Sequence, residues 1–158
     1  WSAITFAEIF RKHTGKDYKS VPAEQMDEVF KKEVRPKITE PTFVTDYPES
    51  LMPLAKLHEK DKTLTESFQL IVNGAEIIKG FSELNDPVVQ RDQMERQEKA
   101  FRAGDEESSR KDEDFLEALE YGMPPAAGLG IGIDRLVAIA TKAHAVKEII
   151  LFPTLRPK

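Results

Sequence analysis

The sequence predicts a fold of the α+β class, because strand patterns and amphipathic helical patterns occur in one chain of ordinary globular composition. The 158 residues are 40% hydrophobic and 32% charged, which suits a domain with a substantial core. A hairpin pattern at 68–81 and a glycine-rich segment at 128–132 predict strands. Apolar residues at helical spacing predict helices over 6–14, 22–36, 86–104 and 115–122.

The composition excludes several classes of protein. There is no cysteine, so disulfides, thiolate metal sites and thiol catalysis are all absent. The net charge of −5 gives no general attraction to polyanions, so any contact with nucleic acid needs a local patch or another part of a longer protein. No apolar run reaches the roughly 20 residues of a membrane span, and no signal peptide opens the chain. We therefore expect a cytoplasmic protein with no membrane partner.

The first 48 residues predict two helices and a short strand. Thr5 and Glu8 form a capping-box pattern at the start of the first helix, which ends near Gly15. The second helix runs from Pro22 to Pro36. The β-branched and aromatic run at 41–48 predicts the strand, and Pro41 and Pro48 limit it to a sheet edge or confine the prolines to its ends.

The segment 68–81 gives a strong hairpin signal, because Asn73 and Gly74 supply the two positive φ angles of a type I′ turn. In that register Ile71 faces Glu76. Strict alternation then predicts two faces of the hairpin. One face carries Gln69, Ile71, Glu76 and Ile78, and the other carries Leu70, Ile77, Lys79 and Phe81. Glu76 and Glu83 would lie on opposite faces unless a bulge at Gly80 shifts the alternation.

The charged helix 86–104 begins with Asp86 as its N-cap and Pro87 in its first turn. Its apolar stripe is thin, so we expect a solvated surface helix. The run at 149–152 is short and apolar and predicts a buried strand.

The glycine-rich segment carries Gly128, Gly130 and Gly132 on alternate positions, and Arg135 follows where the pattern changes from strand to helix. The glycines leave one face of the strand without side chains, so a ligand or another backbone can approach closely. A bare surface that ends in a guanidinium suits a flat, anionic ligand such as a nucleotide. Neither the dinucleotide pattern nor the phosphate-loop pattern fits these residues. A strand that merely permits close packing is the alternative.

No catalytic nucleophile is evident, and the three histidines have no metal-ligand spacing. Charged groups do fall among apolar residues of the hairpin and beyond it, namely Glu76, Lys79 and Glu83. A buried carboxylate needs a cationic partner, so Glu83 is expected to face a metal or a ligand ammonium. Pairing with Lys79 inside the protein is the simpler alternative.

Four segments of the chain form a recognisable set. They are Gly-Leu-Gly-Ile-Gly-Ile-Asp-Arg-Leu at 128–136, Pro-Thr-Phe-Val-Thr-Asp-Tyr-Pro at 41–48, Gly-Phe-Ser-Glu-Leu-Asn-Asp-Pro at 80–87 and Leu-Phe-Pro-Thr-Leu-Arg-Pro at 151–157. Together they resemble the class II lysyl-tRNA synthetases, and the first is similar to motif 3 of that family. The resemblance covers the C-terminal half of the catalytic domain, so 1–158 is expected to be a single, incomplete domain.

The resemblance implies a six- or seven-stranded antiparallel sheet flanked by helices, on which lysine and ATP form lysyl-adenylate with Mg²⁺ before lysine passes to tRNA-Lys. It implies a homodimer for the full-length protein. Arg135 would be the catalytic residue that stacks on adenine and orients the triphosphate, above an ATP-binding floor of Gly128, Gly130 and Gly132. Glu76 would face ATP phosphates and metal. Lysine would contact Lys79, Phe81 and Glu83, with Glu83 as a second metal-facing group.

The sequence also departs from the family pattern. Gln69 replaces a usual metal-facing glutamate, and Lys79 replaces a usual asparagine, so metal charge balance and lysine binding are both affected. Motifs 1 and 2, which supply the α-phosphate arginine and much of the dimer interface, are absent. We therefore expect negligible aminoacylation by this segment alone. Two alternatives are a paralogue that attaches lysine or β-lysine to elongation factor P and a non-catalytic module that binds a nucleotide or a protein.

Overall fold

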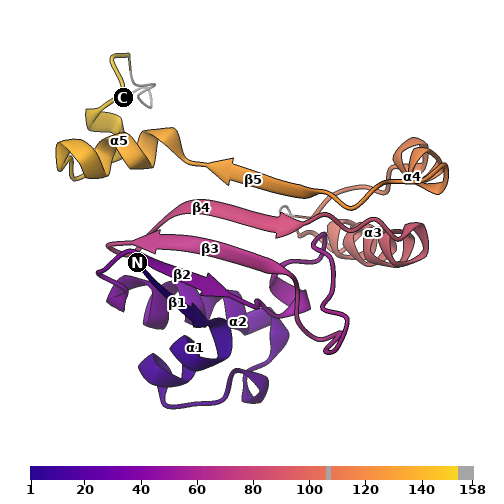
Figure 1. Cartoon of the computed structure of the whole chain (residues 1–158), viewed down its shortest axis with the longest axis horizontal. Coiled ribbons are helices and arrows are strands. Elements are labelled where there is room, and N and C mark those ends of the chain that lie inside the picture. Colours follow the sequence, from indigo (N-terminus) through magenta and orange to yellow (C-terminus); the bar gives the residue numbers. More distant parts are fainter. Residues whose placement is uncertain (106–107, 153–158) are drawn as a thin grey trace.

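A five-stranded sheet forms the centre of the computed structural model, which describes residues 1–105 and 108–152 (Figure 1). Its strands lie in chain order: β1 (Ser2–Thr5), β2 (Thr42–Thr45), β3 (Ser67–Val72), β4 (Ala75–Ser82) and β5 (Ala127–Ile131). The α-helices are α1 (Phe6–Thr14), α2 (Ala23–Val29), α3 (Pro87–Arg102), α4 (Glu113–Glu120) and α5 (Ile133–Thr141). The short helices are η1 (Tyr18–Ser20), η2 (Phe30–Val34), η3 (Arg35–Lys37), η4 (Glu49–Leu51) and η5 (Val146–Glu148).

The sheet is mixed, because β1 runs parallel to β2 and all other neighbouring strands are antiparallel. The predicted α+β class is therefore confirmed, and β1 is an addition to the prediction. Its four residues are too few to show an alternating pattern. Thr5 ends this strand and caps α1: its hydroxyl accepts from the Glu8 N–H (3.3 Å), and the Glu8 carboxylate accepts from the Thr5 N–H (3.0 Å). The predicted capping box is confirmed.

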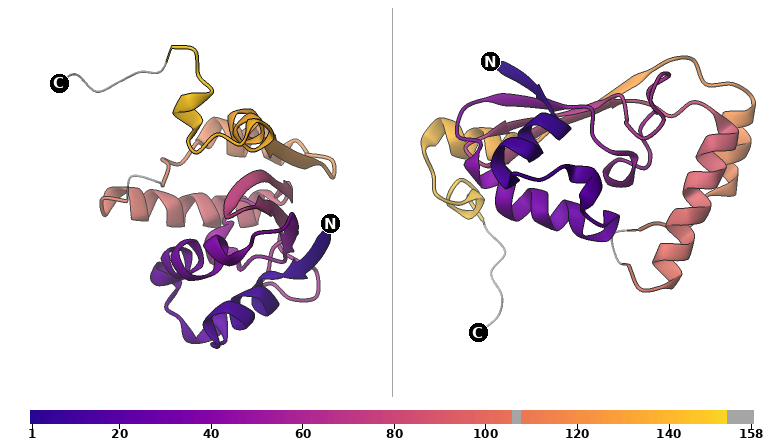
Figure 2. Two further views of the ribbon diagram at one scale, coloured as in Figure 1. Left: turned by 90° about the vertical axis from the view of Figure 1, so that its left-hand side faces the viewer. Right: turned by 90° about the horizontal axis from the view of Figure 1, so that it is seen from below.

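Helices α1 and α2 cover one face of the sheet on the side of β1 to β3 (Figure 2). The core there is rich in aromatic rings. The Phe6 ring centroid lies 4.9 Å from that of Phe30 and 5.1 Å from that of Tyr47. Val44 of β2 and Ile71 of β3 are fully buried against this cluster. The apolar faces of the two helices therefore pack against this face of the sheet and form the hydrophobic core with it.

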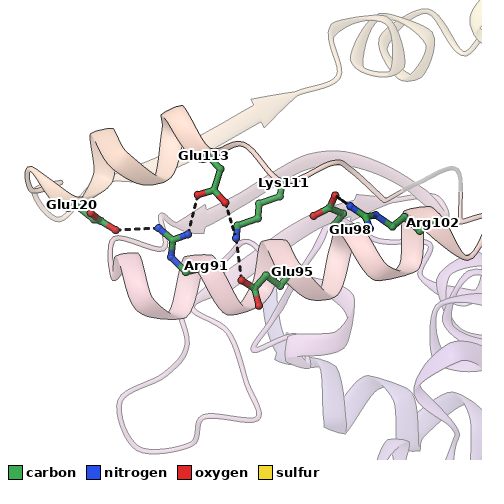
Figure 3. A network of polar contacts seen from close by, with 7 residues as sticks. All are labelled: Arg91, Glu95, Glu98, Arg102, Lys111, Glu113 and Glu120. Atoms are coloured by element: carbon green, nitrogen blue, oxygen red, sulfur yellow. Dashed lines mark hydrogen bonds and ion pairs between the residues drawn. The ribbon is translucent and has the colours of Figure 1, made fainter.

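Helices α3 and α4 lie side by side at one end of the sheet, and α5 lies at the other end (Figure 1). Ion pairs join α3 to α4 and to Lys111, which lies just before α4 (Figure 3). Arg91 donates to Glu113 (2.9 Å) and Glu120 (3.1 Å), and Lys111 lies 3.0 Å from Glu95 and 2.8 Å from Glu113. The charges of the predicted surface helix thus form ion pairs with its neighbour.

The hairpin between β3 and β4 has the predicted turn, with positive φ at Asn73 (48°) and Gly74 (73°). Ile71 pairs with Glu76, as predicted. The next pair is Leu70 with Ile78, so Ile77 is an extra residue in β4. This β-bulge shifts the alternation of every residue that follows it.

The bulge corrects the predicted faces of β4. Lys79 and Phe81 lie on the face of Glu76, and Ile78 lies on the other face. The predicted bulge position, Gly80, pairs regularly with Phe68. A Cβ at Gly80 would lie 2.7 Å from Cε1 of the Phe68 ring, so the glycine is explained by close packing instead.

Residues 149–152 do not form the predicted buried strand. Leu151 and Phe152 are each 90% exposed, and η5 ends just before this run. A four-residue apolar run cannot by itself create a strand, because no described segment lies opposite to pair with it. Residues 153–157 of the fourth family motif lie outside the described residues.

We expect Gly74→Ala to destabilise the protein by about 2–3 kcal/mol, because alanine is strained at positive φ and its Cβ would lie 3.3 Å from the Pro36 Cα. Gly15 is the matched control, since its φ is 74° and nothing lies within 4 Å of its Cβ position. Gly15→Ala should cost about 1 kcal/mol. Urea unfolding of both variants measures the difference, and equal losses would contradict a role for the Pro36 contact.

Candidate active site

The bulge places the predicted site residues of β4 on one face, beside the glycine strand. Lys79 lies opposite Gln69 of β3 on one side and Gly130 of β5 on the other. Phe81 lies opposite Gly128. Directly opposed residues on neighbouring strands share a face, so these five residues belong to one surface.

A cavity of about 470 Å³ opens on this face, next to the helical layer. From the sheet it is lined by Gln69, Glu76, Lys79 and Phe81, and Tyr47, which follows β2, adds to the lining. Phe30 and Arg35 line it from the helical side, and the segment 50–55 supplies a loop wall. That loop follows Glu49, whose carboxylate accepts hydrogen bonds from Arg96 (2.8 Å) and Gln93 of α3. The charged helix α3 therefore helps to position the cavity wall.

Tyr47 orients Gln69 at the floor of the cavity. Its hydroxyl is buried and donates to Gln69 Oε1 at 2.8 Å. Burial raises the pKa of the Tyr47 hydroxyl, the charge of Glu76 raises it further, and Arg35 opposes the shift, so Tyr47 stays a protonated donor. With one lone pair of its amide oxygen engaged by Tyr47, Gln69 keeps N–H donors and one further oxygen lone pair, and it brings no negative charge to the cavity.

Arg135 is tied to the bulge. Its Nη1 donates to the carbonyl oxygen of Glu76 at 2.7 Å and lies 4.0 Å from Glu76 Oε1. The next carbonyl, that of Ile77, accepts from the Gly132 N–H at 2.8 Å. The bulge thus fixes the junction between β5 and α5. The Arg135 side chain remains 52% exposed, and its flat guanidinium is free to contact a ligand.

The three glycines of the motif have different surroundings. A Cβ at Gly130 would come no closer than 3.8 Å to another residue, the Lys79 carbonyl oxygen, and one at Gly132 no closer than 3.5 Å. Protein packing therefore does not exclude a side chain at either position. At Gly128 a Cβ would overlap the carboxylate of Glu83. The close-packing explanation thus applies to Gly128, and ligand approach remains the prediction for the other two.

The structure therefore divides the predicted site residues into two groups. Gln69, Glu76, Lys79 and Phe81 line the cavity. Glu83, Gly128, Gly130, Gly132 and Arg135 lie outside its lining, along the neighbouring parts of β4, β5 and α5. Within residues 1–105 and 108–152, Lys79 forms no ion pair with Glu76 or Glu83, so the predicted internal pairing is absent from the described structure.

Comparison with known families agrees with the glycine motif and its surroundings. The model of the family described as tRNA synthetases class II (D, K and N) matches residues 1–156. The chain belongs to the class II tRNA synthetases. The predicted resemblance is confirmed, and the five-stranded sheet with its flanking helices is consistent with the fold of this family.

Several relatives of this synthetase chain are lysine–tRNA ligases. The enzyme of Moorella thermoacetica is 41% identical across the whole chain, that of Pelotomaculum thermopropionicum is 50% identical over 84% of it, and that of Gloeobacter violaceus is 51% identical over 83% of it. The chain spans 37%, 26% and 26% of the lengths of these relatives. It thus corresponds to about a quarter to a third of such an enzyme.

Sequence reasoning missed the contributions of Tyr47, Arg35 and the loop wall to this cavity. Tyr47 lies in the run 41–48, which predicts a short strand. Nothing in that local pattern indicates the hydrogen bond from Tyr47 to Gln69. Arg35 stood next to the proline expected to end the second helix. The predicted helix is confirmed as the run of α2, η2 and η3, but its place against the sheet, which carries Arg35 to the cavity, was not predicted.

We expect Tyr47→Phe to lower the free energy of unfolding by about 1–2 kcal/mol, because the buried Gln69 oxygen loses its donor. Tyr18→Phe is the matched control, since Tyr18 is also buried and its hydroxyl has no hydrogen-bond partner among the described residues. Urea unfolding measures both variants. A loss at Tyr18 as large as that at Tyr47 would contradict the role of the hydrogen bond.

The pH dependence of stability, compared between the wild type and Tyr47→Phe, tests the raised pKa of the Tyr47 hydroxyl. The folded protein holds the Tyr47 proton at pH values where the unfolded chain releases it, because its pKa is raised in the fold. The stability that this group contributes is complete below about pH 10, the ordinary pKa of tyrosine, and decreases above it. The advantage of the wild type over Tyr47→Phe should therefore shrink as the pH rises above about 10.

Proposed function

We propose that residues 1–158 form the C-terminal part of the catalytic domain of a lysine–tRNA ligase, which activates lysine with ATP and transfers it to tRNA-Lys. The observation that carries the proposal is the surface created by the bulge. It aligns Glu76, Lys79 and Phe81 with the glycine strand that ends in Arg135. The identity with lysine–tRNA ligases over most of the chain supports the same assignment.

The proposal assigns the activity to a longer polypeptide. In this chain β5 and α5 leave apolar side chains exposed, with Leu129 and Ile133 each 60% exposed. Apolar surface of this kind usually packs against another protein surface. Motifs 1 and 2 and the contacts to tRNA and to a second subunit would then come from the rest of the polypeptide. Segment 1–158 alone would hold part of an active site and show negligible aminoacylation.

The ATP site would be built on β5 and the start of α5. Arg135, the proposed catalytic residue, would stack its guanidinium on the adenine and help to orient the triphosphate, while Gly130 and Gly132 leave the strand open beneath it. Lys79 and Arg35 place two cationic side chains around the neighbouring cavity, where phosphate oxygens could bind. These groups would position ATP and neutralise charge at the α-phosphate, so no side-chain nucleophile is needed.

The residues fit a magnesium ion that is shared with ATP. Among the described residues no three His, Asp or Glu side chains gather into a metal site. Mg²⁺ is commonly held by one or two carboxylates together with substrate phosphates. Glu76 would supply the carboxylate, whereas Glu83, seven residues further along, would face the lysine ammonium, and the ion would neutralise phosphate charge. Gln69 would contribute no charge to this site.

The lysine site would extend along β4. Phe81 would pack against the methylene groups of lysine, and Glu83 would accept its ε-ammonium. The surroundings of Glu83 support this role. Its half-buried carboxylate has no hydrogen bond or ion pair within the described part of the chain. A half-buried carboxylate of that kind is stabilised when a cation binds.

Two alternatives make different predictions. A non-catalytic module would bind neither substrate, and a paralogue that modifies elongation factor P would use lysine without charging tRNA. We expect the complete polypeptide that contains this chain to bind both ATP and lysine in calorimetric titrations and to charge tRNA-Lys. Absence of binding of either ligand would overturn the site assignment. Transfer of lysine to elongation factor P and not to tRNA would favour the paralogue.

We expect Glu83→Gln in the complete polypeptide to raise the KM for lysine about 10- to 100-fold, because the amide loses the charge that pairs with the ε-ammonium. The KM for ATP should change less than about threefold. Glu98→Gln is the control, since Glu98 is also a half-buried glutamate but lies on α3, away from the candidate site residues. ATP–pyrophosphate exchange measures both constants, and equal losses for lysine and ATP would refute the role of Glu83.

A further inference from the structure

Glu83 is held by its backbone on both sides. Its N–H donates to the carbonyl oxygen of Ala126 at 3.0 Å, just before β5. On its other side it forms a β-bridge with Ala55, a residue of the cavity loop. The Cα of Glu83 is therefore fixed between the loop and the glycine strand. A change nearby can move its side chain more easily than its backbone.

The carboxylate of Glu83 lies in the space that a side chain at residue 128 would occupy. A Cβ built on Gly128 would overlap Glu83 Oε1 and lie 3.4 Å from its Cδ. These are the described contacts within 4 Å of that position. The glycine therefore provides room for one particular group, the carboxylate. Gly130 and Gly132 have no comparable contact with Glu83.

We infer that Gly128 is a positioning residue for lysine recognition, because its missing side chain lets the Glu83 carboxylate lie over β5. The inference rests on the proposed lysine-binding role of Glu83. It assigns Gly128 to the amino acid, whereas the family resemblance groups it with the ATP-binding floor. Within the glycine motif, Gly128 then positions Glu83, the carboxylate that would bind the lysine ammonium, whereas Gly130 and Gly132 would leave room for the nucleotide.

A methyl group at residue 128 should leave the fold intact and displace the carboxylate of Glu83. The atom it meets is the far end of a flexible side chain, which can rotate away, while the backbone of Glu83 keeps its two partners. A displacement of about 1 Å in a group that positions substrate can cost about 100-fold in rate. The expected damage is therefore specific to lysine.

The test uses Gly128→Ala in the complete polypeptide, with Gly130→Ala as the matched control on the same strand. Gly128→Ala should reduce kcat/KM for lysine about 10- to 100-fold in ATP–pyrophosphate exchange and change the KM for ATP less than about threefold. Gly130→Ala should show the reverse preference. Thermal unfolding midpoints within about 3 °C of the wild type would verify that both variants fold.

A double-mutant cycle identifies the route of the effect. In a Glu83→Ala background the collision is absent, so Gly128→Ala should change lysine use less than about twofold. Additive losses would overturn the inference. Where Glu83→Ala has no measurable activity, a crystal structure of Gly128→Ala decides, since an unmoved Glu83 carboxylate would overturn it. A wild-type protein that does not bind lysine would instead overturn the proposed function, while a displaced carboxylate in that crystal structure would still support the steric relation.

Discussion

The extra residue in β4 is the constraint on which the candidate site depends. Without the bulge at Ile77, strict alternation would place Lys79 and Phe81 on the opposite face from Glu76. The bulge also presents two successive carbonyl groups, and these bind Gly132 and Arg135. The bulge therefore determines on which face of the sheet the cavity residues lie, and it anchors the helix that carries Arg135. A bulge beside a site commonly re-aims side chains in this way.

The sequence predicted this hairpin in everything except the bulge, and the reason is physical. The turn residues Asn73 and Gly74 have distinctive φ requirements, so they can be identified from residue type. Ile77 has no such requirement and looks like any strand residue. Gly80 was the better candidate on residue type, but its glycine is explained by the Phe68 ring. A glycine indicates close approach or a bend, and residue type alone does not distinguish the two.

The site was predictable to the extent that its residues lie in contiguous motifs. Glu76, Phe81 and Glu83 belong to one strand and its extension, and Arg135 follows the glycine strand directly. Tyr47 and Arg35 reach the cavity through tertiary packing, from the end of β2 and from η3. Their contribution depends on how the helical layer covers the sheet, which local patterns do not encode. The same limit applies to the apolar run at 149–152, whose residue types predict a buried strand but do not encode the partner that such a strand needs.

Lys79 poses an electrostatic question, because a lysine substrate and a lysine side chain would share one surface. The strand geometry separates them. A strand rises about 3.3 Å per residue, so the Cα atoms of Lys79 and Glu83 lie about 13 Å apart. An ε-ammonium bound at Glu83 would therefore lie well along the strand from Lys79, which lines the cavity together with Arg35. On the proposed function, the cations would face phosphates at one end of the surface and Glu83 would face the substrate ammonium at the other, so Lys79 is compatible with a lysine substrate.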